Sequence, residues 1–210
     1  MKSNGRLILF TSYAPGAGKT FEMLNYAGVL SKKFHVIYGY INHQPKRAFT
    51  KRYEPVSLSS QRNQAYLNVH KIILVHPDYV VVDELAYYNT YTKHRLYVDV
   101  KDLLQAGISV ITCCNLRSFK RVNDRYAKET KIRFNNPIPD NYFENIHEVR
   151  FVDIDACHLR ERYRSGKLFS NKSKILDRYF ELSILQKCRS IAQEELINYE
   201  REYSNITVVR

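Results

Sequence analysis

The sequence predicts an α/β fold in which helices cover both faces of a mainly parallel sheet. Short apolar runs, typical of buried strands, alternate along the chain with segments whose apolar residues recur at helical spacing. A glycine-rich turn directly follows the first of these runs and opens the first helix. With 210 residues, 44% of them hydrophobic and 26% charged, the chain is also large and apolar enough to bury a substantial core.

Five apolar runs are the expected strands, and two segments with helical spacing lie between them. The strands are predicted at residues 7–10, 35–41, 79–82, 108–114 and 149–154, and the helices at residues 20–30 and 98–106. After residue 170 the chain has a helical pattern rich in Glu, Lys and Arg, which predicts one or two further helices. We therefore divide the chain into a nucleotide-binding unit, residues 1–169, and a C-terminal helical extension, residues 170–210. Residues 205–209 have the pattern of a strand that could open another domain.

The charge and the cysteine content of the chain indicate which kinds of binding partner and which cellular compartment to expect. Lys and Arg number 33 against 21 Asp and Glu, and this net charge of +12 favours anionic partners such as nucleotides, nucleic acid, acidic lipid or an acidic protein surface. The four cysteines lack the spacing of a zinc site. No apolar run is long enough to cross a bilayer and no signal peptide is visible, so we expect a cytoplasmic location and no membrane insertion by this chain.

The glycine-rich turn has the pattern of a Walker A loop. Pro15, Gly16, Ala17, Gly18, Lys19 and Thr20 lie between the first strand and the first helix. Glycines allow backbone N–H groups to approach phosphate oxygens, a lysine can bridge the β- and γ-phosphates, and a threonine hydroxyl is a ligand for Mg²⁺. The loop therefore predicts ATP and Mg²⁺ as ligands. The usual first glycine of the motif falls on Tyr13, so the chain must enter the loop without it.

Two acidic residues that end the 79–82 strand are the candidate Walker B residues. A parallel neighbour of the first strand would end beside the phosphate loop, at the carboxyl edge of the sheet. We expect Asp83 to hold Mg²⁺ through water, together with Thr20, and Glu84 to orient or activate an attacking water. An acidic pair at a strand end is also an ordinary solvated turn, so the catalytic role of Glu84 and the hydrolysis of ATP are left open.

At this point the sequence resembles a known family, the cytoplasmic N-terminal sensor domain of KdpD, the osmosensitive potassium-response histidine kinase. The resemblance covers residues 5–169. Its most specific segments are residues 5–7 (GRL), 14–20 (APGAGKT), 36–41 (VIYGYI), 81–86 (VVDELA) and 103–108 (LLQAGI). It implies a three-layer fold like that of P-loop NTPases, and an ATP-binding regulatory domain that acts as a nucleotide-dependent switch on a partner kinase.

The resemblance also implies which domains are partners of this chain, and the sequence departs from the family at some positions. The partners would be the histidine-kinase domain or other domains of the same sensor system, which would place the chain at the inner face of the membrane as part of a longer sensor. No histidine-kinase catalytic core is visible in this chain, so at most a slow ATPase activity is expected. The sequence departs from the family at Asn42, where the family has Glu, and at Tyr87, where it has His.

Two basic stretches leave other functions open. Residues 117–133 contain seven basic and two acidic residues, and residues 160–174 contain six and one. They are either solvated helix faces or an anion-binding surface, but no DNA- or RNA-reading module accompanies them, so no specific nucleic acid is expected. The alternative functions are a small-molecule P-loop kinase resembling thymidine kinases and a nucleic-acid-dependent ATPase. Tyr13, Tyr87 and Tyr88 lie near the motifs, and they either stack on adenine or are half-buried packing residues.

Overall fold

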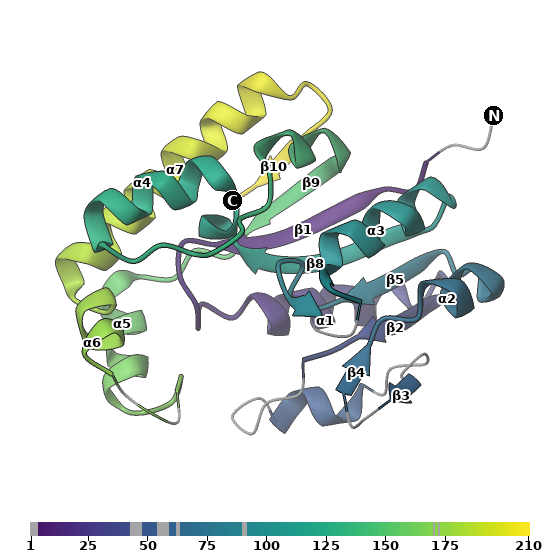
Figure 1. The fold of residues 1–210 in the computed structure, drawn as a ribbon, viewed down its shortest axis with the longest axis horizontal. Coiled ribbons are helices and arrows are strands. Elements are labelled where there is room, and N and C mark those ends of the chain that lie inside the picture. The colour runs from purple at the N-terminus through teal and green to yellow at the C-terminus, as the bar shows by residue number, and fades with distance from the viewer. Residues whose placement is uncertain are drawn as a thin grey trace.

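The computed structural model describes residues 4–42, 48–53, 59–61, 64–89, 92–169, 171 and 173–210. A six-stranded sheet with all of its neighbouring strands parallel runs through the centre, and helices cover its two faces (Figure 1). In spatial order the strands are β10 (Thr207–Val209), β9 (Ile146–Phe151), β1 (Leu7–Ser12), β8 (Ser109–Asn115), β5 (Tyr79–Val82) and β2 (Val36–Tyr40). The predicted three-layer α/β fold is therefore confirmed.

The remaining elements connect these strands. The helices are α1 (Lys19–Leu30), α2 (Val69–Val75), α3 (Leu96–Gln105), α4 (Lys120–Thr130), α5 (Ala156–Arg164), α6 (Lys174–Tyr179) and α7 (Leu182–Glu202). Short 3₁₀ turns form η1 (Ala48–Arg52), η2 (Leu116–Ser118) and η3 (Asp140–Asn145). Two small antiparallel pairs lie outside the main sheet, β3 (Ser59–Gln61) with β4 (Gln64–Tyr66) and β6 (Tyr88–Asn89) with β7 (His94–Arg95).

The two faces of the sheet bury different sets of side chains because successive residues of a strand point to opposite faces. In β1, Ile8 and Phe10 pack with Met23 of α1 in one apolar cluster. Leu7 and Leu9 belong to the larger cluster on the other face, which also includes apolar residues of α2, α3, α4, α5 and α7. Helix α1 and the loop before it are thus fixed to the sheet through a small core of their own.

The order of the strands corrects one expectation. The sequence suggested that the strand ending at Asp83 is the direct neighbour of the first strand, but β8 lies between β1 and β5. The register of β1 with β8 places Ser12 opposite Asn115, so both strands end at the same level of the sheet. Asn115, the last residue of β8, therefore ends the strand next to β1 and lies beside the phosphate loop. Asp83 lies one strand further away.

The C-terminal helix α7 packs along α4 on one face of the sheet (Figure 1). Its apolar residues, including Leu185 and Leu196, belong to the same buried cluster as the core of the sheet. Residues 207–209 form β10, which pairs with β9 and extends the main sheet. Residue 170, at the expected boundary of the helical extension, lies outside the described residues. No helix in the described ranges combines the length and apolarity needed to span a membrane.

Ion pairs between α4 and α7 use part of the basic stretch 117–133. Glu195 is 2% exposed and accepts hydrogen bonds of 2.6 Å from both Arg121 and Arg125. Arg121 also pairs with Glu202, and Arg125 with Glu194. These two arginines therefore hold two helices together, and they are neither fully solvated nor free to bind an external anion.

We predict that Glu195→Gln lowers the stability of the protein. The change removes the buried negative charge that two partly buried guanidinium groups share, which should reduce the free energy of unfolding by about 1–3 kcal/mol. Urea unfolding measures this loss. Glu194→Gln is the matched control, because the Glu194 side chain is 54% exposed and an exposed pair should contribute less than about 1 kcal/mol. Equal losses in the two variants would contradict this role of Glu195.

Candidate phosphate-binding site

The turn between β1 and α1 depends on two glycines with left-handed backbone conformations. Gly16 has φ +88° and Gly18 has φ +108°, a region that L-residues other than glycine rarely adopt. Gly18 is the N-cap of α1 and has no side chain to accept from the first N–H groups of the helix. The N-terminus of α1 is thus left as a group of N–H donors with partial positive charge, which is suited to bind an anion.

Tyr13, at the start of the turn, is buried and hydrogen-bonded, which the sequence did not suggest. Its ring is fully buried, its hydroxyl donates to the Ile154 carbonyl over 2.9 Å, and its own carbonyl accepts from Tyr179 over 3.3 Å. Burial raises the pKa of Tyr13 well above its usual range. An anchored aromatic ring therefore replaces the missing glycine at the loop entry. The expectation that Tyr13 stacks on adenine is wrong because the ring is inaccessible, whereas Tyr87 and Tyr88 are exposed.

Lys19, the first residue of α1, lies against the ends of the two central strands. Its side chain is 9% exposed, and Nζ donates to Ser12 Oγ over 3.1 Å and to Asn115 Oδ1 over 2.7 Å. An ammonium group is costly to bury unless its N–H donors are satisfied. The two oxygens at the ends of β1 and β8 therefore position this charge beside the glycine turn, as the motif requires.

Thr20 and Asp83 meet behind the turn. The Thr20 hydroxyl donates to Asp83 Oδ1 over 3.1 Å, and the Asp83 carboxylate is fully buried. Asp83 Oδ1 also accepts from the Cys113 thiol at 2.9 Å, and Oδ2 from the Asn42 N–H at 3.3 Å. Burial and the neighbouring Asp83 charge raise the pKa of Cys113, which keeps the thiol protonated and able to donate. Three elements, α1, β8 and the end of β2, therefore orient one carboxylate.

The oxygen atoms of Thr20 and Asp83 are suitable ligands for a magnesium ion. Mg²⁺ prefers hard oxygen ligands and keeps several of its waters, so one hydroxyl and one nearby carboxylate are a suitable partial set. Thr20 and Asp83 provide such a pair at 3.1 Å. No group of three or more His, Cys, Asp or Glu side chains within the described ranges forms an alternative metal site. Thr20 and Asp83 are the residues that would hold the ion.

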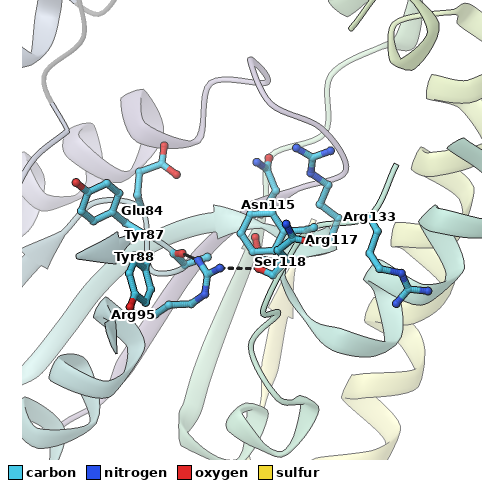
Figure 2. A pocket seen from close by; sticks show the side chains of 11 residues that line it. Glu84, Tyr87, Tyr88, Arg95, Asn115, Arg117, Ser118 and Arg133 are labelled. Carbon is cyan, nitrogen blue, oxygen red and sulfur yellow. Dashed lines mark hydrogen bonds between the residues drawn. The ribbon is translucent and has the colours of Figure 1, made fainter. Parts of the chain in front are cut away.

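Glu84 is directed away from this cluster. Its backbone has φ +60°, an unusual value for a residue with a side chain, and it is half-buried. The side chain lines a cavity of about 510 Å³ that Asn115 also borders (Figure 2). Glu84 therefore lies at this cavity together with Asn115, and its place at the site differs from that of Asp83 although the two residues are adjacent in the chain.

The sequence did not identify Ser12, Cys113 and Asn115 as site residues. Asn115 carried a usable signal, because it is a polar residue that ends a long apolar strand, as Asp83 does. Its contact with Lys19 could not be predicted, since it depends on β8 lying next to β1. Ser12 and Cys113 carry no comparable signal in a single sequence.

The fold and the glycine turn place this chain in the class of three-layer α/β proteins with a P-loop-like arrangement. Within that class, the family described as KdpD, the osmosensitive K⁺ channel His kinase sensor domain, has a model that matches residues 3–198. The chain therefore belongs to the KdpD family. The matched region extends past residue 169 and includes most of α7.

Individual relatives agree with this family. The chain is 28% identical over 223 residues to the sensor protein KdpD of Clostridium acetobutylicum, covering 98% of this chain and 25% of that protein. It is 30% identical over 200 residues to the sensor protein KdpD of Mycobacterium tuberculosis, covering 90% and 23%. For a putative sensor protein KdpD of Synechocystis the identity is 27% over 212 residues, covering 95% and 57%. The chain thus spans about a quarter of the length of the first two relatives.

We predict opposite effects of alanine at two glycines near α1. At Gly16 an added Cβ would lie 2.6 Å from the Leu168 side chain and would require the left-handed φ of +88°. Gly16→Ala should therefore lower the free energy of unfolding by about 1–3 kcal/mol. Gly28 lies within α1 with open space around its Cα, so Gly28→Ala should raise it by about 0.4–1 kcal/mol. Denaturant unfolding of both variants without ligand is the test, and a stabilising Gly16→Ala would refute this turn geometry.

Proposed function

We propose that this chain is an ATP-binding regulatory domain of a KdpD-type two-component system. In this proposal Mg²⁺·ATP occupancy switches a partner histidine-kinase domain of the same system during potassium limitation or osmotic stress. The observation that carries it is the meeting of Lys19, Thr20 and Asp83 at one edge of the sheet, next to a glycine turn and an uncapped helix N-terminus. The family description, a His kinase sensor domain, supports the regulatory role.

Each residue of the cluster has a distinct part in holding the nucleotide. The N–H groups of the turn from Gly16 to Gly18 and of the first turn of α1 would bind phosphate oxygens. Lys19 would bind the β- and γ-phosphates, and Thr20 and Asp83 would hold the metal. When bound, Mg²⁺ neutralises part of the phosphate charge. Asn42 and Cys113 keep the Asp83 carboxylate in its orientation through their hydrogen bonds.

The contact between Lys19 and Asn115 suggests how occupancy becomes a signal. A phosphate competes with Asn115 for the Lys19 ammonium group, since both are hydrogen-bond acceptors. Loss or retention of this 2.7 Å contact changes the end of β8, and η2 and α4 follow Asn115 directly. A ligand can bias two conformations only through contacts that differ between them, and this contact is such a difference.

The two alternative functions have less support. A thymidine-kinase-like enzyme would need a nucleoside acceptor beside the phosphate loop, and a nucleic-acid-dependent ATPase would need a free basic surface. Arg121 and Arg125, two cations of the 117–133 stretch, already pair with glutamates of α7. Turnover assays with thymidine and with duplex DNA separate the functions: phosphorylated thymidine would favour the first alternative, and DNA-stimulated hydrolysis the second.

Lys19→Met tests the nucleotide site itself. The variant keeps the buried aliphatic volume but removes the charge, so the charge-assisted contact of about 1.5–3 kcal/mol should be lost and ATP affinity should fall roughly 10- to 150-fold. Titration calorimetry with ATP and Mg²⁺ measures the change. Lys32→Met, at an exposed position after α1, is the control and should bind as the wild type does. Equal affinity of the Lys19 variant and the wild type would show that ATP binds elsewhere.

Asp83→Asn and Glu84→Gln test the division of roles between the two acidic residues. The ratio of ATP affinities with and without Mg²⁺ should fall toward one in Asp83→Asn, because a neutral amide no longer favours the metal. In Glu84→Gln the ratio should stay unchanged, since a residue that orients water acts in the transition state. Wild-type turnover should be well below the ~10 s⁻¹ typical of metabolic enzymes. If kinase output fails in Glu84→Gln while its ATP binding is normal, hydrolysis itself is the signal and a passive switch is excluded.

A further inference from the structure

A cavity next to the Lys19–Asn115 contact is not explained by the nucleotide site. Its volume is about 510 Å³, within the range of small-molecule sites. One wall is formed by Glu84, Tyr87, Tyr88 and Arg95, and the facing wall by Asn115, Arg117, Ser118 and Arg133 (Figure 2). The first wall belongs to the β6–β7 hairpin and the residues before it, and the second contains the end of β8 and the turn η2. The two walls thus follow Asp83 and β8 directly along the chain.

The charge of the cavity is strongly positive. Its lining contains three arginines, at 95, 117 and 133, and one carboxylate, Glu84. Arg133 pairs with Asp124 outside the cavity. Among the described residues, no carboxylate forms an ion pair with Arg95, and Arg117 likewise lies over the Tyr179 ring, 5.0 Å from its centre, with no carboxylate partner. Two of the three cations therefore have aromatic and carbonyl neighbours in place of anions.

Arg95 is the clearest example of a positive charge in the cavity without a carboxylate partner among the described residues. Its Nη1 donates to the Ala86 carbonyl and its Nη2 to the Asn135 carbonyl over 2.6 Å, so the side chain links the two walls. Its Nε is buried and has no hydrogen-bond partner within the described ranges. Burial lowers the pKa of Arg95, as expected for a cation that has no carboxylate partner among the described residues. A buried N–H donor without a partner is unfavourable and is satisfied when a ligand supplies an acceptor.

We infer that this cavity binds a small phosphomonoester that carries a ring, as a second ligand beside the nucleotide. Arg95 and Arg117 have no carboxylate partner among the described residues, so their two charges exceed the single negative charge of Glu84, and a phosphomonoester, with about −1.5 to −2 charge at neutral pH, supplies further negative charge. The planar guanidinium groups match the oxygens of phosphate. Phe134, whose ring centre lies 4.8 Å from the Arg95 guanidinium, and the exposed Tyr88 provide apolar faces for the ring.

The site is distinct from the phosphate and metal contacts of the proposed nucleotide site, although Asn115 and Glu84 border both. The glycine turn, Lys19, Thr20 and Asp83 do not line the cavity. Each site can therefore be removed without the other, and a failure of ATP binding would not count against the phosphomonoester site.

The test uses phenyl phosphate as the probe in calorimetry on the full chain, with and without saturating Mg²⁺ and a non-hydrolysable ATP analogue. Binding should persist with the analogue present. Arg95→Gln and Arg117→Gln should each weaken it by about tenfold or more, because each removes a charged donor. Arg201→Gln, at an exposed position of α7, is the matched control and should leave binding unchanged. Inorganic phosphate should bind more weakly than phenyl phosphate, and benzoate more weakly still.

Several results would overturn the inference. If the ATP analogue displaces phenyl phosphate, and if Lys19→Met no longer binds phenyl phosphate, the probe binds at the nucleotide site. Equal weakening in Arg201→Gln would show nonspecific attraction to a basic protein, and no binding to the wild type would exclude the site. If Arg95→Gln fails to unfold cooperatively on heating, Arg117→Gln carries the comparison. Arg117 holds no backbone carbonyl across the cavity in the way that Arg95 does, so its variant should keep its fold.

Discussion

A buried ammonium group holds the carboxyl edge of this sheet together. Lys19 is almost fully removed from water, and the oxygens that satisfy it, Ser12 Oγ and Asn115 Oδ1, end two adjacent strands. These residues are paired in the register of β1 with β8. A slip of one residue would turn Asn115 to the opposite face of the sheet and remove the closer of these two acceptors from the buried charge, which is unfavourable. The register of β1 with β8 therefore also determines the position of the Lys19 ammonium group.

The same argument applies to the negative charge two strands away. Asp83 is fully buried and its oxygens receive hydrogen bonds from α1, β8 and the backbone at Asn42. Because Cys113 remains a thiol beside this carboxylate, it donates a hydrogen bond and adds no second negative charge. A carboxylate that accepts several hydrogen bonds stays in one orientation. The arrangement orients Asp83 toward Thr20 without any ligand, as the proposed magnesium site would require.

Local patterns in the sequence predicted the parts of the site that depend on neighbouring residues. The glycine turn is recognisable because Gly16 and Gly18 must adopt left-handed conformations within six residues of β1, and Asp83 because it ends an apolar run. Asn115 was missed as a Lys19 partner because its role depends on β8 lying between β1 and β5, and strand order is set by packing between distant segments. Arg121 was misjudged for the same reason: its partner Glu195 is 74 residues away.

The packing of helix α4 was missed because its apolar face is sparse. Helix α4 buries only a few residues, among them Val122 and Tyr126, and is otherwise strongly charged, so its sequence looked like a solvated basic stretch. Its position is fixed by tertiary contacts, the ion pairs to α7 and a hydrogen bond from the Tyr126 hydroxyl to the Cys188 carbonyl over 2.7 Å. Propensity within one segment carries no information about such partners. The predicted division at residue 169 remains a prediction, although the cores on its two sides are continuous.

The physical connection between the edge of the sheet and the rest of the molecule follows from these contacts. Asn115 touches Lys19 on one side and borders the positively charged cavity on the other. Arg95 bridges the hairpin that follows Asp83 and the segment that follows α4, by donating to carbonyls of both. Under the proposed function, ATP would compete with Asn115 for Lys19, and if this changes how well the cavity binds an anion, thermodynamic reciprocity requires the anion to change the affinity for ATP by the same factor. Helix α4 follows η2 and is tied to α7 by the ion pairs of Arg121 and Arg125 with Glu195, so α7 is the element that such a change would reach through α4.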